Sequence, residues 1–276
     1  MIKDLVVRLA VGTERDQAAQ FAIAIAQAFE AHIAGIAFAY EPVIVPTIAD
    51  GLAAAWIDTQ RSDNRTAAQA AIDRFEAAAA RDGVSVEHRL IEASLGAAAG
   101  LFGRLARRFD LAVVGQTPPE AMLPDDLFIE SALFESGRPT VVVPYIQEHG
   151  LKLGRVLACW DASRHAARAI ADAMPFLRRG KTIEIVIVAN ARAPADEVPG
   201  ADIGAHLARH GLAVEVKRLI AEDTDVANAI LSHVADSGAD FIVMGGYGHS
   251  RLREFVLGGA TRGMLAQMTV PVLMAH

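Results

Sequence analysis

The chain has 276 residues, of which 53% are apolar and 21% are charged, and its formal net charge is −7. This length exceeds what one compact core needs, and the apolar content excludes an intrinsically disordered chain. The acidic balance argues against a nucleic-acid-binding protein, which normally carries a basic face, but it leaves small anionic ligands open.

Targeting and redox features are few. The first residues lead directly into an apolar segment, without the layout of a signal peptide. No apolar run reaches membrane-spanning length. The single cysteine, Cys159, excludes an internal disulfide and a cysteine-based metal cluster, and its apolar surroundings predict a small buried side chain. We therefore expect a cytoplasmic protein with no metal site and no membrane partner.

The first half of the chain alternates apolar strands with helices. Continuous apolar strands are typical of a parallel sheet that helices cover on both faces. We expect strands over 4–11, 32–40, 84–91, 110–115 and 140–144, and helices over 14–29, over a long region ending at residue 81, and over 95–107.

The second half repeats this alternation. We expect strands over 155–160, 182–190, 213–220, 240–245 and 270–274, and helices over 164–177, 201–210 and 225–237, with a last helix after residue 260. Strands that alternate with helices in this way predict a right-handed, doubly wound parallel sheet in each half.

The two halves are an internal duplication. The segment VGTERDQAA at 11–19 corresponds to DASRHAARA at 161–169, and FDLAVVGQ at 109–116 corresponds to ADFIVMGG at 239–246. We place one domain at 1–146 and the second at 152–276. The first half carries about 20 extra residues, which we place at 41–66, before a longer second helix.

A glycine-containing segment follows the fourth strand of the second half. Gly245 and Gly248 leave the strand, and Gly258 and Gly259 precede the last helix. Ligands of open α/β sheets bind at the carboxyl ends of the strands, and main-chain amides at a helix N-terminus attract phosphate. A P-loop is excluded because no Gly-Lys-Ser/Thr occurs, and a dinucleotide fingerprint is excluded because residue 251 is arginine.

Each candidate residue also has a structural interpretation. The four glycines serve equally as turn residues, and Asp161 serves as an N-cap of the following helix. Thr261 is either a cap or a residue of the first helical turn. His249 lies in the glycine segment, but the sequence assigns it no carboxylate or nucleophile, so we predict no catalytic residue.

The pattern Gly245-x2-Gly248-x9-Gly258-Gly259 resembles the G-x2-G-x9-G-[S/T] pattern of ATP-binding universal stress proteins. Gly259 departs from it, because the family has serine or threonine there. Asp161 matches the aspartate that the family has at the end of its first strand, beside the adenosine. The resemblance implies a nucleotide site made of Asp161, Met244, Gly245, Gly248, Gly258, Gly259, Ala260 and Thr261.

The first half departs further from this family. Val11 stands where the aspartate is expected, and Gly115-Gln116-Thr117-Pro118-Pro119 replaces the glycine segment, with prolines that lack amide donors. The resemblance therefore implies two tandem flavodoxin-like domains (adenine nucleotide alpha hydrolase-like), each a five-stranded parallel sheet with helices on both faces, the first without a nucleotide site. It also implies that the halves form an intramolecular pseudo-dimer through their last strands, with a further homodimer as an open alternative.

Three functional hypotheses follow from this resemblance. The first is a stress-response module that binds ATP or a related adenine nucleotide, with or without Mg²⁺, in the second domain. The second is an interaction protein that works without nucleotide, which the Gly259 departure favours. The third is a slow ATPase, which ranks last because the glycine segment offers no general base, so we expect no enzyme.

Overall fold

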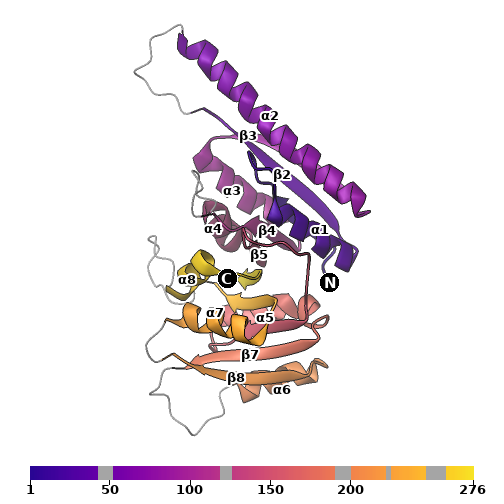
Figure 1. Ribbon diagram of the computed structural model, residues 1–276, viewed down its shortest axis with the longest axis vertical. Helices are drawn as coiled ribbons and strands as arrows, with labels where there is room; N and C mark the ends of the chain where they lie inside the picture. Colours follow the sequence, from indigo (N-terminus) through magenta and orange to yellow (C-terminus); the bar gives the residue numbers. More distant parts are fainter. Residues whose placement is uncertain (43–51, 119–125, 190–199, 222–224, 247–258) are drawn as a thin grey trace. The chain divides into compact units, whose positions relative to one another are not determined.

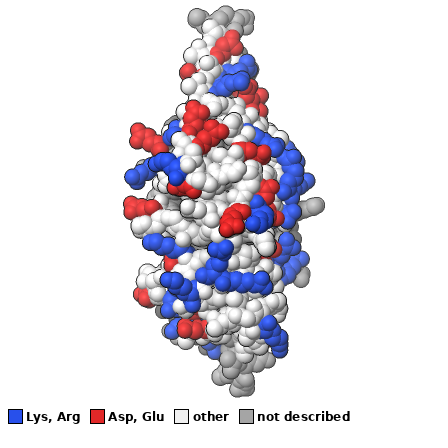
Figure 2. Space-filling view, turned by 90° about the vertical axis from the view of Figure 1, so that its right-hand side faces the viewer, with Lys and Arg blue, Asp and Glu red and all other residues white. Residues whose placement is uncertain are grey.

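The computed structural model describes residues 1–42, 52–118, 126–189, 200–221, 225–246 and 259–276 (Figure 1). The chain divides into two compact units, one over Ile2–Arg138 and one over Pro139–His276 together with Met1. Over the described residues, no helix is both long enough and apolar enough to cross a bilayer. Figure 2 shows one face of the surface, on which basic and acidic side chains both occur.

The unit over Ile2–Arg138 is a parallel α/β sheet in the order β3-β2-β1-β4. Its buried strands β1 and β2 supply the core, as expected for strands covered on both faces. The elements are β1 (Asp4–Arg8), α1 (Gln17–Phe29), β2 (His32–Tyr40), α2 (Leu52–Arg81), β3 (Val86–Ala93), α3 (Leu95–Ala106), β4 (Leu111–Gly115) and α4 (Asp126–Glu135).

Helix α2 contains the length difference between the two halves. It has 30 residues, whereas α6, at the corresponding place in the second unit, has 9. Its buried side chains, among them Ala68, Ile72 and Phe75, come from its second half. The prediction of a longer second helix in the first half is therefore confirmed. Helix α4 was not predicted.

The second unit contains a sheet in the order β5-β10-β9-β6-β7-β8. All its pairings are parallel except that of β5 with β10, which is antiparallel. The elements are β5 (Thr140–Val143), β6 (Arg155–Cys159), α5 (Arg164–Leu177), β7 (Thr182–Ala189), α6 (Ala201–Arg209), β8 (Val214–Ile220), α7 (Val226–Ser237), β9 (Phe241–Gly245), α8 (Gly259–Gln267) and β10 (Val272–Ala275).

The order of the strands determines where a ligand fits. From β6 the chain continues outward to β7 and β8, whereas β9 lies on the other side of β6 and leads to β10. The strand order therefore reverses between β6 and β9, and open α/β sheets form a crevice at such a point, outside the carboxyl ends of the strands. Each half is a flavodoxin-like α/β fold, so the predicted fold class is confirmed. The strands β5 and β10, which end the two halves of the sequence, pair with each other through Thr140–Val142.

Candidate functional site

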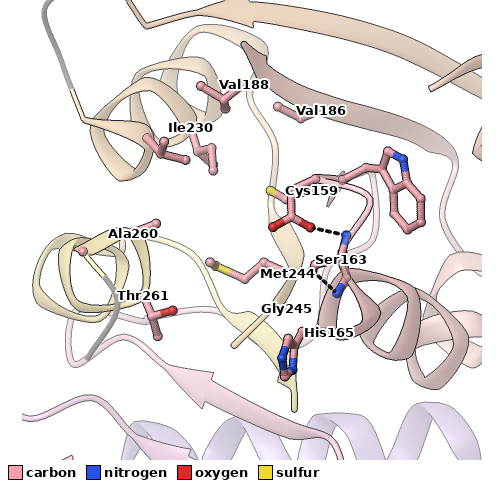
Figure 3. A pocket seen from close by; sticks show the side chains of 15 residues that line it. Cys159, Ser163, His165, Val186, Val188, Ile230, Met244, Gly245, Ala260 and Thr261 are labelled. Atoms are coloured by element: carbon pink, nitrogen blue, oxygen red, sulfur yellow. Dashed lines mark hydrogen bonds between the residues drawn. The ribbon is translucent and has the colours of Figure 1, made fainter. Parts of the chain in front are cut away.

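A cavity of about 320 Å³ opens at the carboxyl ends of β6, β7 and β9 in the second unit (Figure 3). Its apolar side is formed by Val186 and Val188 of β7 and by Ile230 of α7. On the other side are the end of β9 and the beginning of α8. The volume lies at the lower end of the range of about 300–1,000 Å³ that is usual for small-molecule sites.

Six of the eight predicted site residues line this one cavity. Two other predicted residues, Gly248 and Gly258, lie outside the described residues. The cavity-lining residues from the prediction are Asp161, Met244, Gly245, Gly259, Ala260 and Thr261. The segments that contribute them are about 80 residues apart in the sequence, and the adjacency of β6 and β9 brings them together.

Asp161 lies in a tight turn between β6 and α5. One oxygen of its carboxylate, Oδ1, accepts a hydrogen bond of 2.9 Å from the amide of Ser163. The N-cap of α5 is Ser163, whose hydroxyl accepts from the amide of Ala166 at 3.1 Å, so the capping interpretation of Asp161 is wrong. Between them Ala162 has a left-handed backbone with φ of 60°. This conformation costs a residue with a Cβ roughly 1–2 kcal/mol, and here it presents the exposed Asp161 carboxylate to the cavity.

Gly245 is required by packing at the end of β9. A Cβ atom at this position would lie 2.7 Å from the amide nitrogen of Ala166 and 2.9 Å from the Cβ of His165. Such contacts are too short for any other residue, so this glycine allows the first turn of α5 to lie directly against β9. The turn interpretation of Gly245 is thereby replaced by a close approach of two backbones.

Helix α8 begins at Gly259, beside the cavity. Among the described residues, no atom lies within 4 Å of a Cβ atom placed at Gly259, so they leave room for the hydroxyl that this position lacks. Thr261 is in the first helical turn and is 4% exposed. Amides in the first turn of a helix have no partner within the helix and carry a partial positive charge, so this end of the cavity favours anions.

Cys159 ends the buried strand β6, as predicted, and is half-buried where it lines the cavity. Desolvation, and then the negative charge of Asp161, raise the pKa of its thiol to about 12. The thiol is therefore neutral at physiological pH. It serves as part of the apolar surface and not as a nucleophile.

Several lining residues were not predicted, among them His165 of α5 and the three aliphatic side chains of β7 and α7. Val186, Val188 and Ile230 resemble any other core residue in the sequence. Only the fold identifies them, because Val186 and Val188 lie toward the carboxyl end of β7, next to β6, and Ile230 lies on α7 beside them. Among the described residues, no group of three or more His, Cys, Asp or Glu side chains is arranged to hold a metal ion.

In the first unit, large side chains occupy the place that corresponds to this cavity. The strand registers put Arg8 in the position of Cys159 and Phe38 in that of Val188, and counting back from the helix ends puts Phe128 in that of Ala260. The ring of Phe128 lies 5.4 Å from that of Phe38, and the Arg8 guanidinium lies 4.8 Å from the centre of the Phe128 ring. Phe128 is 2% exposed, so it belongs to the core of this unit.

Fold and site together define the second unit as a flavodoxin-like domain with a ligand cavity at its switch point. Residues 152–276 match the model of the Universal stress protein family. Over 67 residues, it is 34% identical to the universal stress protein Slr1230 of Synechocystis sp.. That match spans 24% of this chain and only 22% of the relative's own length.

Several solved structures resemble the whole chain. A universal stress protein from Archaeoglobus fulgidus has a TM-score of 0.68 at 16% identity, with 99% of this chain and 97% of that one covered. A protein of unknown function from Pseudomonas aeruginosa has a TM-score of 0.65 at 14% identity, with 99% and 92% covered. At these identities the likeness establishes the fold.

Proposed function

We propose that the second half of this chain binds ATP or a related adenine nucleotide in the cavity of about 320 Å³. The observation that carries the proposal is the convergence of an aliphatic surface, an exposed carboxylate and a helix N-terminus on that cavity. These three features match, in order, the base, the ribose hydroxyls and the phosphates of a nucleotide.

The aliphatic side supports binding of the base. Val186, Val188 and Ile230 present branched side chains to the cavity, as Figure 3 shows. A planar purine inserted against them removes apolar surface from water on its faces, at roughly 25 cal/mol per Å². The neutral thiol of Cys159 extends this surface, because its pKa is raised to about 12.

The carboxylate of Asp161 supports ribose recognition. Ribose hydroxyls are hydrogen-bond donors, and an ionised carboxylate is a strong acceptor for them. The turn built on Ala162 and Ser163 orients this side chain, because the Ser163 amide already occupies Oδ1. Oδ2 is the atom that we assign to the ribose.

The phosphates are assigned to the first turn of α8. Gly259, Ala260 and Thr261 line the cavity there, and backbone amides at a helix N-terminus bind phosphate without help from a side chain. The loss of the family's hydroxyl at Gly259 removes one donor but leaves the amides. Mg²⁺ would be held mainly by the phosphates of the nucleotide, as is usual for this ion.

Titration calorimetry of the full chain with ATP tests this function. We expect saturable binding, and a loss of at least about 10-fold in affinity for Asp161→Ala, since a hydrogen bond to a charged group contributes about 1.5–3 kcal/mol. Asp236→Ala is the matched control, because Asp236 is exposed on α7 and does not line the cavity. Absence of heat and of any thermal shift at millimolar ATP would overturn the proposal.

The absence of a side chain at Gly259 favours a second candidate, a stress-response interaction protein that works without nucleotide. This candidate predicts that the purified chain contains no small molecule. It also predicts that partner binding survives Asp161→Ala. Mass spectrometry of compounds released from freshly purified protein separates the two, because a co-purified nucleotide would contradict it.

We also propose that the halves form a pseudo-dimer within one cytoplasmic chain. The antiparallel pairing of β5 with β10 supports a role of the two last strands in this arrangement. Light scattering measures whether the chain associates further into a homodimer, which we treat as an open alternative.

A further inference from the structure

The cavity contains a histidine that the proposed function does not use. His165 is the second residue of α5, is 5% exposed and lines the cavity. Figure 3 shows it beside Gly245, on the side opposite Val186 and Val188. It therefore lies where β9 finishes, on the side of the cavity that also contains the beginning of α8, to which we assign the phosphates.

The ring of His165 stacks on the ring of His276. The two ring centroids are 4.4 Å apart and the planes are inclined by 28°. His276 follows β10, and its Nδ1 lies 3.3 Å from the carbonyl oxygen of Gly246. Because a carbonyl only accepts hydrogen bonds, this Nδ1 carries a proton and donates it.

Arg164 holds His165 in its neutral form. Its Nε donates to Nε2 of His165 at 3.2 Å, so Nε2 is an acceptor and the ring proton is on Nδ1. Within the described part of the chain, the charged and titratable groups near this ring include the guanidinium of Arg164 and the imidazole of His276, and the carboxylate of Asp161 lines the same cavity. Without a ligand, the guanidinium and the second imidazole oppose a positive charge on His165.

A polyphosphate changes this balance. Its negative charge at the end of β9 would favour a cation nearby, and histidine is the side chain that gains a proton most readily near neutral pH. The stacked rings of His165 and His276 can carry only one positive charge between them, since two facing imidazolium rings would repel each other.

We propose that His165 is a phosphate-recognition residue of this cavity and that the His165–His276 stack takes up one proton from solvent when a polyphosphate binds. The proton goes to Nε2 of His165, from which Arg164 withdraws, and the imidazolium then pairs with a phosphate oxygen. The inference rests on the proposed nucleotide site and adds a pH dependence of ligand affinity to it. Affinity for phosphorylated nucleotides rises as pH falls, whereas affinity for the nucleoside does not change.

The test is calorimetry of the full chain with ATP and with adenosine, at pH 6, 7 and 8, in two buffers of different ionisation enthalpy. For ATP we expect affinity to rise about 5- to 10-fold from pH 8 to pH 6, and the observed heat to depend on the buffer, which measures proton uptake. For adenosine we expect neither effect. A pH dependence of the same size for both ligands would overturn the inference.

The terminal phosphate of the ligand itself titrates near pH 6, so it can also take up a proton. A variant without the histidine separates these two sources of proton uptake. His165→Asn should reduce the number of protons taken up with ATP and leave adenosine affinity within about twofold. His206→Asn is the matched control, because His206, in α6, belongs to another histidine pair of the described residues, in which its ring lies 4.8 Å from that of His210.

The outcomes distinguish this inference from the proposed function. Proton uptake by His165→Asn equal to that of the unaltered chain overturns the role of the histidine and leaves the nucleotide site intact. No binding of either ligand at any pH removes both. If His165→Asn unfolds at lower temperature than the unaltered chain, His165→Gln replaces it, and we expect the same loss of uptake.

Discussion

The two halves of this chain share a fold, but the location that is a cavity in the second half is filled by side chains in the first. In the second unit Cys159, Val188 and Ala260 surround a cavity, and in the first unit Arg8, Phe38 and Phe128 fill the corresponding positions. Small residues at the carboxyl edge of a sheet leave space for a ligand, whereas larger ones convert that space into core. A duplicated domain therefore loses a site through a few changes of side-chain volume, without a change of fold.

The largest expected effect comes from removing the ring that fills the first unit. Phe128→Ala leaves a cavity under Phe38 and Arg8, and large-to-small changes of buried aromatic residues cost about 3–5 kcal/mol. We expect urea unfolding to report that loss. Phe134→Ala is the control on the same helix, since Phe134 is 47% exposed and its loss should cost far less.

The reciprocal change should fill the cavity of the second unit. Ala260→Phe places a ring where the cavity is now open, as Phe128 does in the first unit. We expect ATP affinity to fall by about 100-fold, which corresponds to roughly 3 kcal/mol, with the fold retained. Ala266→Phe on the exposed face of α8 should bind normally. Normal binding by Ala260→Phe would mean that the ligand does not use this cavity.

The two glycines that end β4 and β9 provide the next comparison. A Cβ at Gly245 would lie 2.7 Å from the Ala166 amide nitrogen, whereas one at Gly115 would lie 3.7 Å from the Cβ of Ala18. We expect Gly245→Ala to lower stability by about 1–3 kcal/mol through overpacking. Gly115→Ala should be neutral or slightly stabilising. Thermal unfolding of both variants checks this difference, and equal effects would contradict it.

A smaller effect is expected from restoring the family hydroxyl. Gly259→Ser introduces a side chain at a position where no atom of the described residues lies within 4 Å of the added Cβ. A single added hydrogen bond to phosphate should tighten ATP binding by about 1 kcal/mol, or roughly fivefold. Gly259→Ala separates the hydroxyl from the added Cβ. If alanine improves affinity as much as serine, the gain comes from backbone rigidity.

The smallest signal concerns Cys159. Since its thiol pKa is raised to about 12, the thiolate fraction in the folded chain at pH 8 is on the order of 10⁻⁴. Alkylation by iodoacetamide should therefore be slow at pH 8 and accelerate as pH rises, up to the raised pKa. The same chain in guanidinium chloride should react at the rate of an ordinary thiol. Fast labelling of the folded chain at pH 8 would contradict the desolvation argument.

Periodicity and duplication predicted the fold class, because each buried parallel strand is a continuous apolar run followed by a helix. The glycine pattern and Asp161 predicted the part of the site that polar chemistry marks. The aliphatic side of the cavity and His165 were not predictable, because Val186, Val188 and Ile230 resemble ordinary core residues in the sequence and only the fold brings all four residues to the cavity. The cap assigned to Asp161 was wrong because Ser163, two residues later, competes for the same role.

The pairing of β5 with β10 has a practical consequence for anyone who isolates the family-matching half. A fragment that starts at residue 152 lacks Thr140–Val143, so the amides and carbonyls along that side of β10 have no strand beside them. Exposed sheet borders of this kind are templates for self-association. A fragment beginning at Pro139 retains β5 beside β10. For nucleotide-binding studies on part of the chain, we would therefore choose this fragment.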